Sequence, residues 1–245
     1  MMQHLLVFDL SNLCYIGANS QRNQEEVTVE YYFNAAKEYL RSQYRYFKPD
    51  LLVFACDHEQ EYWRKKQFPD YKAQRVDSEL KQKIRQVIQQ FKAENAHLCL
   101  EHPGCEADDV IYALCAFTDY RVTIVSSDGD FEQLINDRVR VFNPMQCQFR
   151  RASGNLPFDL FVKCIRGDRS DNIPSVMPMV TRRRLQEAFR DADPVSVLEK
   201  HDRLNATLRQ DYERNRDLID LSRLPEDLKA ILIAKIKDYF SRPQS

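Results

Sequence analysis

Acidic residues follow the apolar, strand-like runs of this sequence. The runs and the loops after them read LLVFD, LLVFACD, EHPGCEADD and VTIVSSDGD. Their acids are Asp9, Asp57, Glu106, Asp108, Asp109, Asp128 and Asp130. The carboxyl ends of parallel strands face one crevice, which is where such sheets bind ligands. We therefore expect these side chains to lie close together, although they come from distant parts of the chain.

Each acid alone has a simpler interpretation as a turn former or a helix cap. Capping explains one acid at each helix start, but not three in CEADD and two in SSDGD. Carboxylates this dense cannot all stay ionised unless cations neutralise them. Oxygen ligands suit the hard ions Mg²⁺ and Mn²⁺, and a pair of ions about 3.5–4 Å apart is a common device for phosphodiester hydrolysis. His58 and His102 lie nearby in sequence and are interpreted as loop histidines.

The segment from Arg64 to Lys92 is rich in positive charge, with nine basic residues and only three acidic ones. The first part of this span also carries the aromatic residues Tyr62, Trp63, Phe68 and Tyr71. Cations interleaved with rings are typical of single-strand binding, and we favour this function for residues 64–75. For residues 81–92 a solvated helix face is an equally good explanation. The basic run Arg182–Arg184 opens a predicted helix, as either a duplex phosphate contact or an exposed turn.

The elements that position these residues alternate between strands and helices. Strands are predicted at 4–9, 51–56, 97–101, 122–126 and 138–142, and amphipathic helices at 29–47, 80–91, 110–117 and 228–239. After residue 155 only short helices are expected, one of them starting at Asp193-Pro194. This order predicts an α/β fold with a mostly parallel central sheet and helices on both faces.

Composition excludes several classes of protein. Only five glycines are present, so neither a dinucleotide-binding loop nor a P-loop is available. Net charge is −1, and no apolar run is long enough to cross a membrane, so we expect no membrane association. The seven cysteines form no C-x-x-C pair and are interpreted as reduced, in a cytoplasmic protein.

Six motifs together resemble the 5′ nucleases, the family of flap endonucleases, the 5′-nuclease domain of bacterial DNA polymerase I, and phage 5′→3′ exonucleases and RNase H enzymes. They stand in the family's order between about residues 4 and 190. The motifs are Asp9, Asp57, Arg64 with Tyr71–Arg75, Glu106–Asp109, Asp128 with Asp130 and Phe131–Leu134, and Gly167–Pro174.

The resemblance implies a PIN-like catalytic body at 1–155 with a helical arch at about 58–92. It also implies a helical, duplex-binding helix–three-turn–helix region at 156–245. It implies two Mg²⁺ or Mn²⁺ ions. Their ligands would be Asp9, Asp57, Glu106 and Asp108 for one, and Asp108 or Asp109 with Asp128, Asp130 and Asp171 for the other, with Asp168 close by. Arg64 and Lys72 would act on the scissile phosphate, and DNA contacts would come from Tyr15, Lys65, Lys66, Arg75 and Arg182–Arg184.

Two departures from the family pattern matter. Ile16 stands where an arginine usually follows the aromatic residue, and Arg22 is the candidate replacement. The glycine-rich turn after Asn-Ile-Pro is absent, and the chain reads Ser175–Thr181 instead. Glycines there let the backbone approach phosphates and frame a monovalent cation. The potassium site of the family is therefore in doubt for this sequence, with Arg182–Arg184 as the compensating contacts.

The expected function is hydrolysis of phosphodiester bonds near 5′ ends during DNA replication, on DNA with a 5′ flap or 5′ end or on an RNA–DNA hybrid. We expect a monomer in a bacterial cell or phage-infected host, with a polymerase and a single-strand-binding protein as candidate partners. A PIN-type ribonuclease is one alternative, although it has no need of the arch motif. A catalytically inactive module that binds branched DNA is the other, although it would not need every acid.

Overall fold

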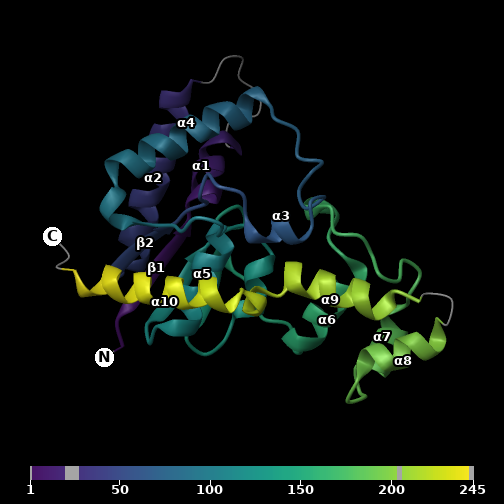
Figure 1. Ribbon diagram of the computed structural model, residues 1–245. Coiled ribbons are helices and arrows are strands. Elements are labelled where there is room, and N and C mark those ends of the chain that lie inside the picture. Colours follow the sequence, from purple (N-terminus) through teal and green to yellow (C-terminus); the bar gives the residue numbers. More distant parts are fainter. Residues whose placement is uncertain (1, 20–27, 203–205, 243–245) are drawn as a thin grey trace. The chain divides into compact units, whose positions relative to one another are not determined.

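The apolar runs of the sequence form the strands of one sheet in the computed structural model (Figure 1), which describes residues 2–19, 28–202 and 206–242. Its strands are β1 (His4–Asp9), β2 (Leu51–Ala55), β3 (Cys99–Leu100), β4 (Arg121–Val125), β5 (Val139–Asn143) and β6 (Gln148–Phe149). In the described residues their order is β3-β2-β1-β4-β5-β6, with every pair parallel except β5 and β6. The predicted, mostly parallel sheet is confirmed.

Successive side chains of the central strands point to opposite faces of the sheet. Leu6, Phe8 and Phe54 pack into a cluster with α1 (Leu10–Asn19), α2 (Val29–Phe47) and α4 (Glu79–Glu94). Thr28 caps α2 and Ser78 caps α4 through their side-chain oxygens, which fixes where both helices start. The apolar stripes at 29–47 and 80–91 thus form helices, as predicted, and cover one face.

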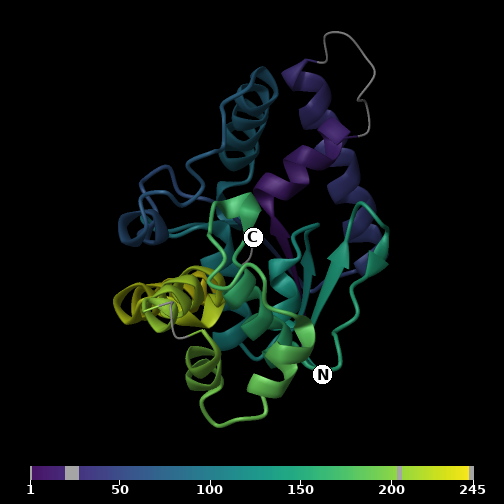
Figure 2. The ribbon, with the colours of Figure 1, turned by 90° about the vertical axis from the view of Figure 1, so that its right-hand side faces the viewer.

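The other face carries α5 (Ala107–Phe117), which packs against β1 and β2. The final helix, α10 (Glu226–Ser241), packs in turn on α5, and the Tyr239 hydroxyl donates a hydrogen bond to the Leu52 carbonyl. Figure 1 shows α2 and α4 above β1 and β2 and α10, in yellow, below them, and Figure 2 shows the same elements turned by 90°. Helices on both faces explain why residues of β1 are buried along its whole length.

The chain divides into two compact units, which are described separately. The first comprises residues 1–62, 77–151 and 225–245, and the second comprises 63–76 and 152–224. The domains 1–155 and 156–245 stay a prediction, and this division differs from them in two segments and in a boundary that comes four residues earlier. The helix α10 belongs to the first unit because it packs on α5. Residues 63–76 belong to the second because their hydrogen-bond partners lie there, as when Arg64 Nε donates to the Leu218 carbonyl at 3.0 Å.

The second unit is helical. It contains α3 (Trp63–Gln67), α6 (Leu156–Arg166), α7 (Arg182–Ala188), α8 (Pro194–His201) and α9 (Leu208–Ile219), around a core that includes Phe161, Leu185 and Leu198. Asp193 caps α8 and Thr181 caps α7, as their positions in the sequence indicate. The helix–three-turn–helix assignment of this region stays a prediction. No helix among the described residues is long and apolar enough to cross a membrane.

The segment predicted as a helical arch, residues 58–92, holds two different structures. Its first part contains the five-residue α3, and its second part is α4. Ile84, Val87 and Phe91 of α4 are buried in the core of the first unit. The basic residues between 81 and 92 lie on the remaining sides of this core helix, where Arg85 is exposed and Lys92 pairs with Glu101.

Candidate functional site

Asp9 is the last residue of β1 and lies at the point where the strand order reverses between β2 and β4. Its carboxylate accepts hydrogen bonds from the Asn12 amide at 3.0 Å and the Ser126 hydroxyl at 3.2 Å. Burial, followed by the negative charge of Asp57, raises the pKa of Asp9 from 3.8 to about 7 despite these bonds, and the charge of Asp128 adds to the effect. Carboxylates from three segments therefore act on one another here.

Asp57 connects the end of β2 to two neighbouring helices. Its Oδ2 accepts from the Ser11 hydroxyl of α1 at 2.9 Å, and its Oδ1 accepts from the Ala107 amide of α5 at 2.9 Å. The second bond places the Asp57 carboxylate at the amino end of α5, where the helix dipole favours negative charge. The second strand-end acid is thus held beside the CEADD motif.

The three acids of CEADD have different surroundings. Glu106 is the N-cap of α5, and Asp109 completes a capping box in which the Glu106 amide donates to Asp109 Oδ2 at 3.0 Å. Asp109 has no exposed surface and Glu106 is only 2% exposed, whereas Asp108 is half-buried. The capping box gives Asp109 a structural role that the sequence motif alone did not separate from metal binding.

Asp128 lies in the loop after β4, and Asp130 is the first residue of the 3₁₀ helix η2 (Asp130–Leu134). Asp128 Oδ1 accepts from the Asp130 amide at 2.8 Å, and the Asp128 amide donates to the Ser126 hydroxyl oxygen at 3.1 Å. Ser126 therefore bonds to both Asp9 and the Asp128 backbone. Of the two acids, Asp128 is exposed and Asp130 is half-buried.

The structure brings the acids of the first unit to the carboxyl edge of the sheet, as the strand-end pattern predicts. Within the described residues, no three Asp, Glu, His or Cys side chains already form a group that would hold a metal ion. Backbone amides and serine hydroxyls occupy several of the carboxylate oxygens instead. The donor set consists of carboxylates, which suits a hard divalent cation, and a cation would offset the repulsion that raises the pKa of Asp9.

Asp171, a predicted metal ligand, lies in the second unit and is surrounded by residues of the basic segment. Arg75 Nη2 lies 2.6 Å from its Oδ1, Lys72 Nζ lies 3.8 Å from its Oδ2, and the Tyr71 hydroxyl donates to Oδ2 at 3.3 Å. The Lys72 amide also donates to the Asp171 carbonyl, with Lys72 in the left-handed region at a φ of 56°. These contacts fasten residues 71–75 to the Gly167–Pro174 motif.

Asp168 and Gly167 shape the start of that motif. Asp168 accepts from the Ser170 amide and hydroxyl, and its Oδ2 lies 3.0 Å from Lys163 Nζ. Burial acts to raise the pKa of Asp168, but the bonds from Ser170 and the charge of Lys163 outweigh it and lower the pKa overall. Gly167 has a φ of 70°, and a Cβ there would lie 2.3 Å from the Ile173 carbonyl oxygen, so only glycine fits.

The predicted phosphate and DNA contacts differ in exposure. Arg64 is only 1% exposed, and its guanidinium lies 4.5 Å from the centre of the Trp63 ring, whereas Lys65 and Lys66 are exposed. Arg182 pairs with Asp159 and Arg183 with Glu187 on α7. The remaining predicted positions are Arg184, which is exposed, Tyr15 and Ile16, which are half-buried on α1, and Arg22, which lies outside the described residues.

The two histidines near the acids stay loop residues. His58 Nδ1 accepts from the Gln60 amide at 3.2 Å, which closes a local turn. Burial lowers the pKa of His102, and the charges of Lys235 and His58 lower it further. Within the part of the chain that the structure describes, neither histidine hydrogen-bonds to one of the strand-end acids.

Sequence reasoning missed the polar residues that hold the acids in place. Ser11, Asn12, Ser126 and Ser127 form bonds at the carboxyl edge, and Asn12 exchanges two with Ser127, at 2.6 and 3.0 Å. The signal was their position immediately after β1 and β4, in FDLSN and VSSD. The Ser11 and Ser126 hydroxyls bond acids that lie 46 and 117 residues away in the chain, so their position marks them as polar residues at this edge of the sheet but does not name their partners.

Comparison with known proteins gives one family. A family model described as the 5′-3′ exonuclease, N-terminal resolvase-like domain, matches residues 4–155. The ribonuclease H of Enterobacteria phage T4 is 25% identical over 178 residues, which are 64% of this chain and 57% of that protein. A 5′-3′ exonuclease of Aquifex aeolicus is 34% identical over 158 residues, 58% of this chain and 54% of that protein. The chain thus spans little more than half the length of these two relatives.

Solved structures share the fold over nearly the whole chain. A bacteriophage T5 flap endonuclease, in a pseudo-enzyme-product complex with DNA and metal ions, has a TM-score of 0.73 at 19% sequence identity. The match covers 98% of this chain and 100% of the T5 chain. At 19% sequence identity, this structural similarity shows a shared fold.

Proposed function

Because this chain belongs to the 5′-3′ exonuclease family, whose N-terminal resolvase-like domain matches residues 4–155, we propose that it is a divalent-metal-dependent 5′ nuclease. The reaction is hydrolysis of a phosphodiester bond near a 5′ end, in DNA that carries a 5′ flap or in an RNA–DNA hybrid. The names of the relatives support both substrates, because one is a ribonuclease H and another is a flap endonuclease in complex with DNA.

One observation carries the proposal: acids from β1, from the loops after β2 and β4, and from the start of α5 occupy one edge of the sheet, and burial and neighbouring charge raise the pKa of Asp9 to about 7. A purely structural cluster would be expected to avoid such repulsion. A metal site can contain carboxylates that repel one another, because the bound cation neutralises their charge.

In this proposal Asp9, Asp57, Glu106 and Asp108 hold one Mg²⁺ or Mn²⁺ ion, and Asp128 and Asp130 contribute to a second. Asp109 supports Glu106 through the capping box. Asp168 and Asp171 of the second unit stay proposed ligands on the resemblance. When bound, the ions supply an activated water and neutralise charge on the phosphate. Ser11 and Ser126 keep the Asp57 and Asp9 carboxylates oriented.

Lys72 is the proposed direct contact to the scissile phosphate. Its Nζ lies 3.8 Å from Asp171, longer than a close ion pair, and its backbone is fixed by the Asp171 carbonyl. Arg64 is buried against Trp63 and Leu218, so a phosphate contact would require this segment to rearrange when substrate binds. Tyr15, Lys65, Lys66, Arg75 and Arg182–Arg184 are the proposed DNA contacts. We also propose a monomeric, cytoplasmic protein that works beside replication proteins.

The test is cleavage of three end-labelled substrates with Mg²⁺: a 5′-flap DNA, the same flap blocked at its 5′ end, and single-stranded RNA. The proposal predicts cleavage of the free flap and none without a divalent ion. Cleavage of RNA alone would favour a PIN-type ribonuclease. Binding of flap DNA without cleavage by any divalent ion would favour the inactive binding module. Comparison of the two flaps separates a requirement for a free 5′ end from internal cutting.

A further inference from the structure

Arg150, the residue after β6, connects that edge strand to the loop that carries Asp128. Its Nη2 donates to the Ser127 carbonyl at 2.5 Å, and its Nη1 lies 2.5 Å from Glu132 Oε1. Its backbone amide donates to a carbonyl of β5 at 2.8 Å, which fixes its position on the sheet. The Arg150 guanidinium therefore holds the loop on both sides of Asp128.

The peptide unit between Ser127 and Asp128 is held at both of its ends. Arg150 binds its carbonyl, and its N–H donates to the Ser126 hydroxyl oxygen at 3.1 Å. Asn12 accepts from the preceding amide, that of Ser127, at 3.0 Å. Because a peptide unit is planar, the direction of its carbonyl also sets the direction of the Asp128 backbone. The bond from Arg150 thus helps to decide where the Asp128 side chain begins.

The Arg150 side chain is poorly placed to contact an outside ligand and is costly to bury. It is 19% exposed, and its Nε is buried without a hydrogen-bond partner among the residues that the structure describes. A buried guanidinium with one unused donor gives little net stability, because desolvation offsets its bonds. The two bonds to the loop affect the position of that loop, and this is the role that the geometry supports.

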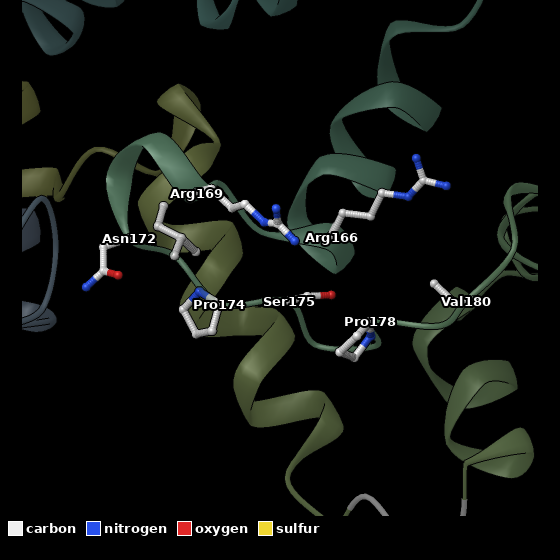
Figure 3. Close-up of a pocket in the computed structure, with 8 residues that line it drawn as sticks. Arg166, Arg169, Asn172, Pro174, Ser175, Pro178 and Val180 are labelled. Carbon is white, nitrogen blue, oxygen red and sulfur yellow. The ribbon is translucent and has the colours of Figure 1, made fainter. Parts of the chain in front are cut away.

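The arginines of the second unit show no such convergence. Arg166 and Arg169 line a pocket of about 590 Å³ there. Figure 3 shows the Arg166 guanidinium directed away from Arg169 and from Ser175 and Pro178. In the first unit, by contrast, both ends of one guanidinium reach a single loop that carries proposed metal ligands.

We infer that Arg150 is a positioning residue for the proposed metal site. Through the Ser127 carbonyl and Glu132 it keeps the loop ordered, so that Asp128 and Asp130 can bind an ion. A loop that is not held must be ordered when the ion binds, and that ordering lowers the affinity. The inference rests on the proposed function, because the two acids are ligands in that proposal. It adds a residue that lies outside the six motifs.

The test measures Mn²⁺ binding without DNA, from the electron paramagnetic resonance signal of the free ion, so its readout does not depend on cleavage. Arg150→Met keeps an unbranched side chain but removes every N–H donor. Arg151→Gln is the matched control, because it removes the same charge from the next residue, which is exposed. Amide hydrogen exchange of residues 126–132 and the Mg²⁺ dependence of single-turnover flap cleavage are recorded for the same proteins.

Arg150→Met should weaken Mn²⁺ binding by about tenfold, which is the usual order of effect for residues that orient metal ligands. It should raise the Mg²⁺ concentration for half-maximal cleavage by a similar factor, and the rate at saturating Mg²⁺ should stay within about threefold of wild type. Amide exchange at residues 126–132 should become faster. Arg150→Lys keeps the charge but has one nitrogen for two acceptors, so its Mn²⁺ binding should be only about threefold weaker. Arg151→Gln should match wild type.

Two results would overturn the inference and leave the proposed function in place. One is a Mn²⁺ affinity of Arg150→Met equal to that of Arg151→Gln. The other is a lower rate at saturating Mg²⁺ with an unchanged half-maximal Mg²⁺ concentration. If Arg150→Met does not fold, Arg150→Lys carries the test, and wild-type Mn²⁺ affinity in that variant would overturn the inference. A wild-type protein that neither binds Mn²⁺ nor cleaves flap DNA would overturn both proposals.

Discussion

The buried carboxyl of Asp9 should make the metal-free protein less stable as pH rises from 4 to 8, and Asp9→Asn should remove that loss. The pKa of Asp9 is about 7 in the folded protein and near 3.8 when unfolded. Between these values the folded state keeps a proton that the unfolded state has released, so raising the pH favours unfolding. The stabilisation of the folded state by the protonated Asp9 carboxyl is fully present below about pH 4 and is lost as the pH rises through 7.

The size of the effect follows from this difference in pKa. About three pKa units correspond to an upper limit of about 4 kcal/mol at pH 8. Asparagine can keep both bonds, by accepting from the Asn12 amide and donating to the Ser126 hydroxyl, but a neutral acceptor weakens the first by about 1 kcal/mol. We therefore expect Asp9→Asn to be about 2–3 kcal/mol more stable than wild type at pH 8, and equal or slightly less stable at pH 4.5.

The assay is urea denaturation in EDTA at pH 4.5, 6, 7 and 8. Asp119→Asn is the matched control, because it makes the same atomic change at an exposed position of the first unit. Asp168, whose pKa is lowered, makes the opposite contribution below pH 4, so the comparison uses the difference between variants at each pH. Equal free energies of unfolding for wild type and Asp9→Asn at pH 8 would refute the reasoning.

Three further predictions concern the elements that hold the site. Gly167→Ala should lower the free energy of unfolding by at least about 2 kcal/mol, measured by urea denaturation, because a Cβ meets the Ile173 carbonyl; a neutral result would mean that the turn relaxes freely. Phe91→Ala should cost about 3–5 kcal/mol in the same assay if α4 is a core helix, and less than 1 kcal/mol if it is not. Asp171→Asn should change overall stability by less than about 2 kcal/mol but speed tryptic cleavage at Arg75, whose ion pair it removes; unchanged cleavage would show that other bonds hold the segment.

Much of the fold could be predicted because its strands are buried on both faces. Such strands appear in the sequence as continuous apolar runs. An acidic residue directly after a run is therefore easy to recognise. The two-residue β6 was missed, since Gln148 and Phe149 are too short a run to show any period. The sequence also did not predict that α10 packs on the first unit. An amphipathic stripe shows that one side of a helix is buried, but not which surface of the protein it contacts.

The candidate site was predicted less completely than the fold. Sequence spacing located the acids but not the bonds that distinguish them. Asp108 and Asp109 are neighbours in one motif, yet Asp109 is buried in a capping box and Asp108 is half-buried. Arg64 looked like a phosphate contact by its place in the basic segment, and its burial follows from packing against Leu218, 154 residues away. Contacts at that separation leave no local pattern in the sequence.

The most direct test of the central claim compares wild type with Asp128→Asn on 5′-flap DNA under single-turnover conditions with Mg²⁺, together with flap binding in EDTA. The account predicts that Asp128→Asn lowers the cleavage rate by at least about a thousandfold and leaves binding within about twofold, because Asp128 is exposed and is a proposed metal ligand, and asparagine can still accept the bond from the Asp130 amide. Cleavage at the wild-type rate by Asp128→Asn would contradict the assignment of the strand-end acids as the catalytic metal site.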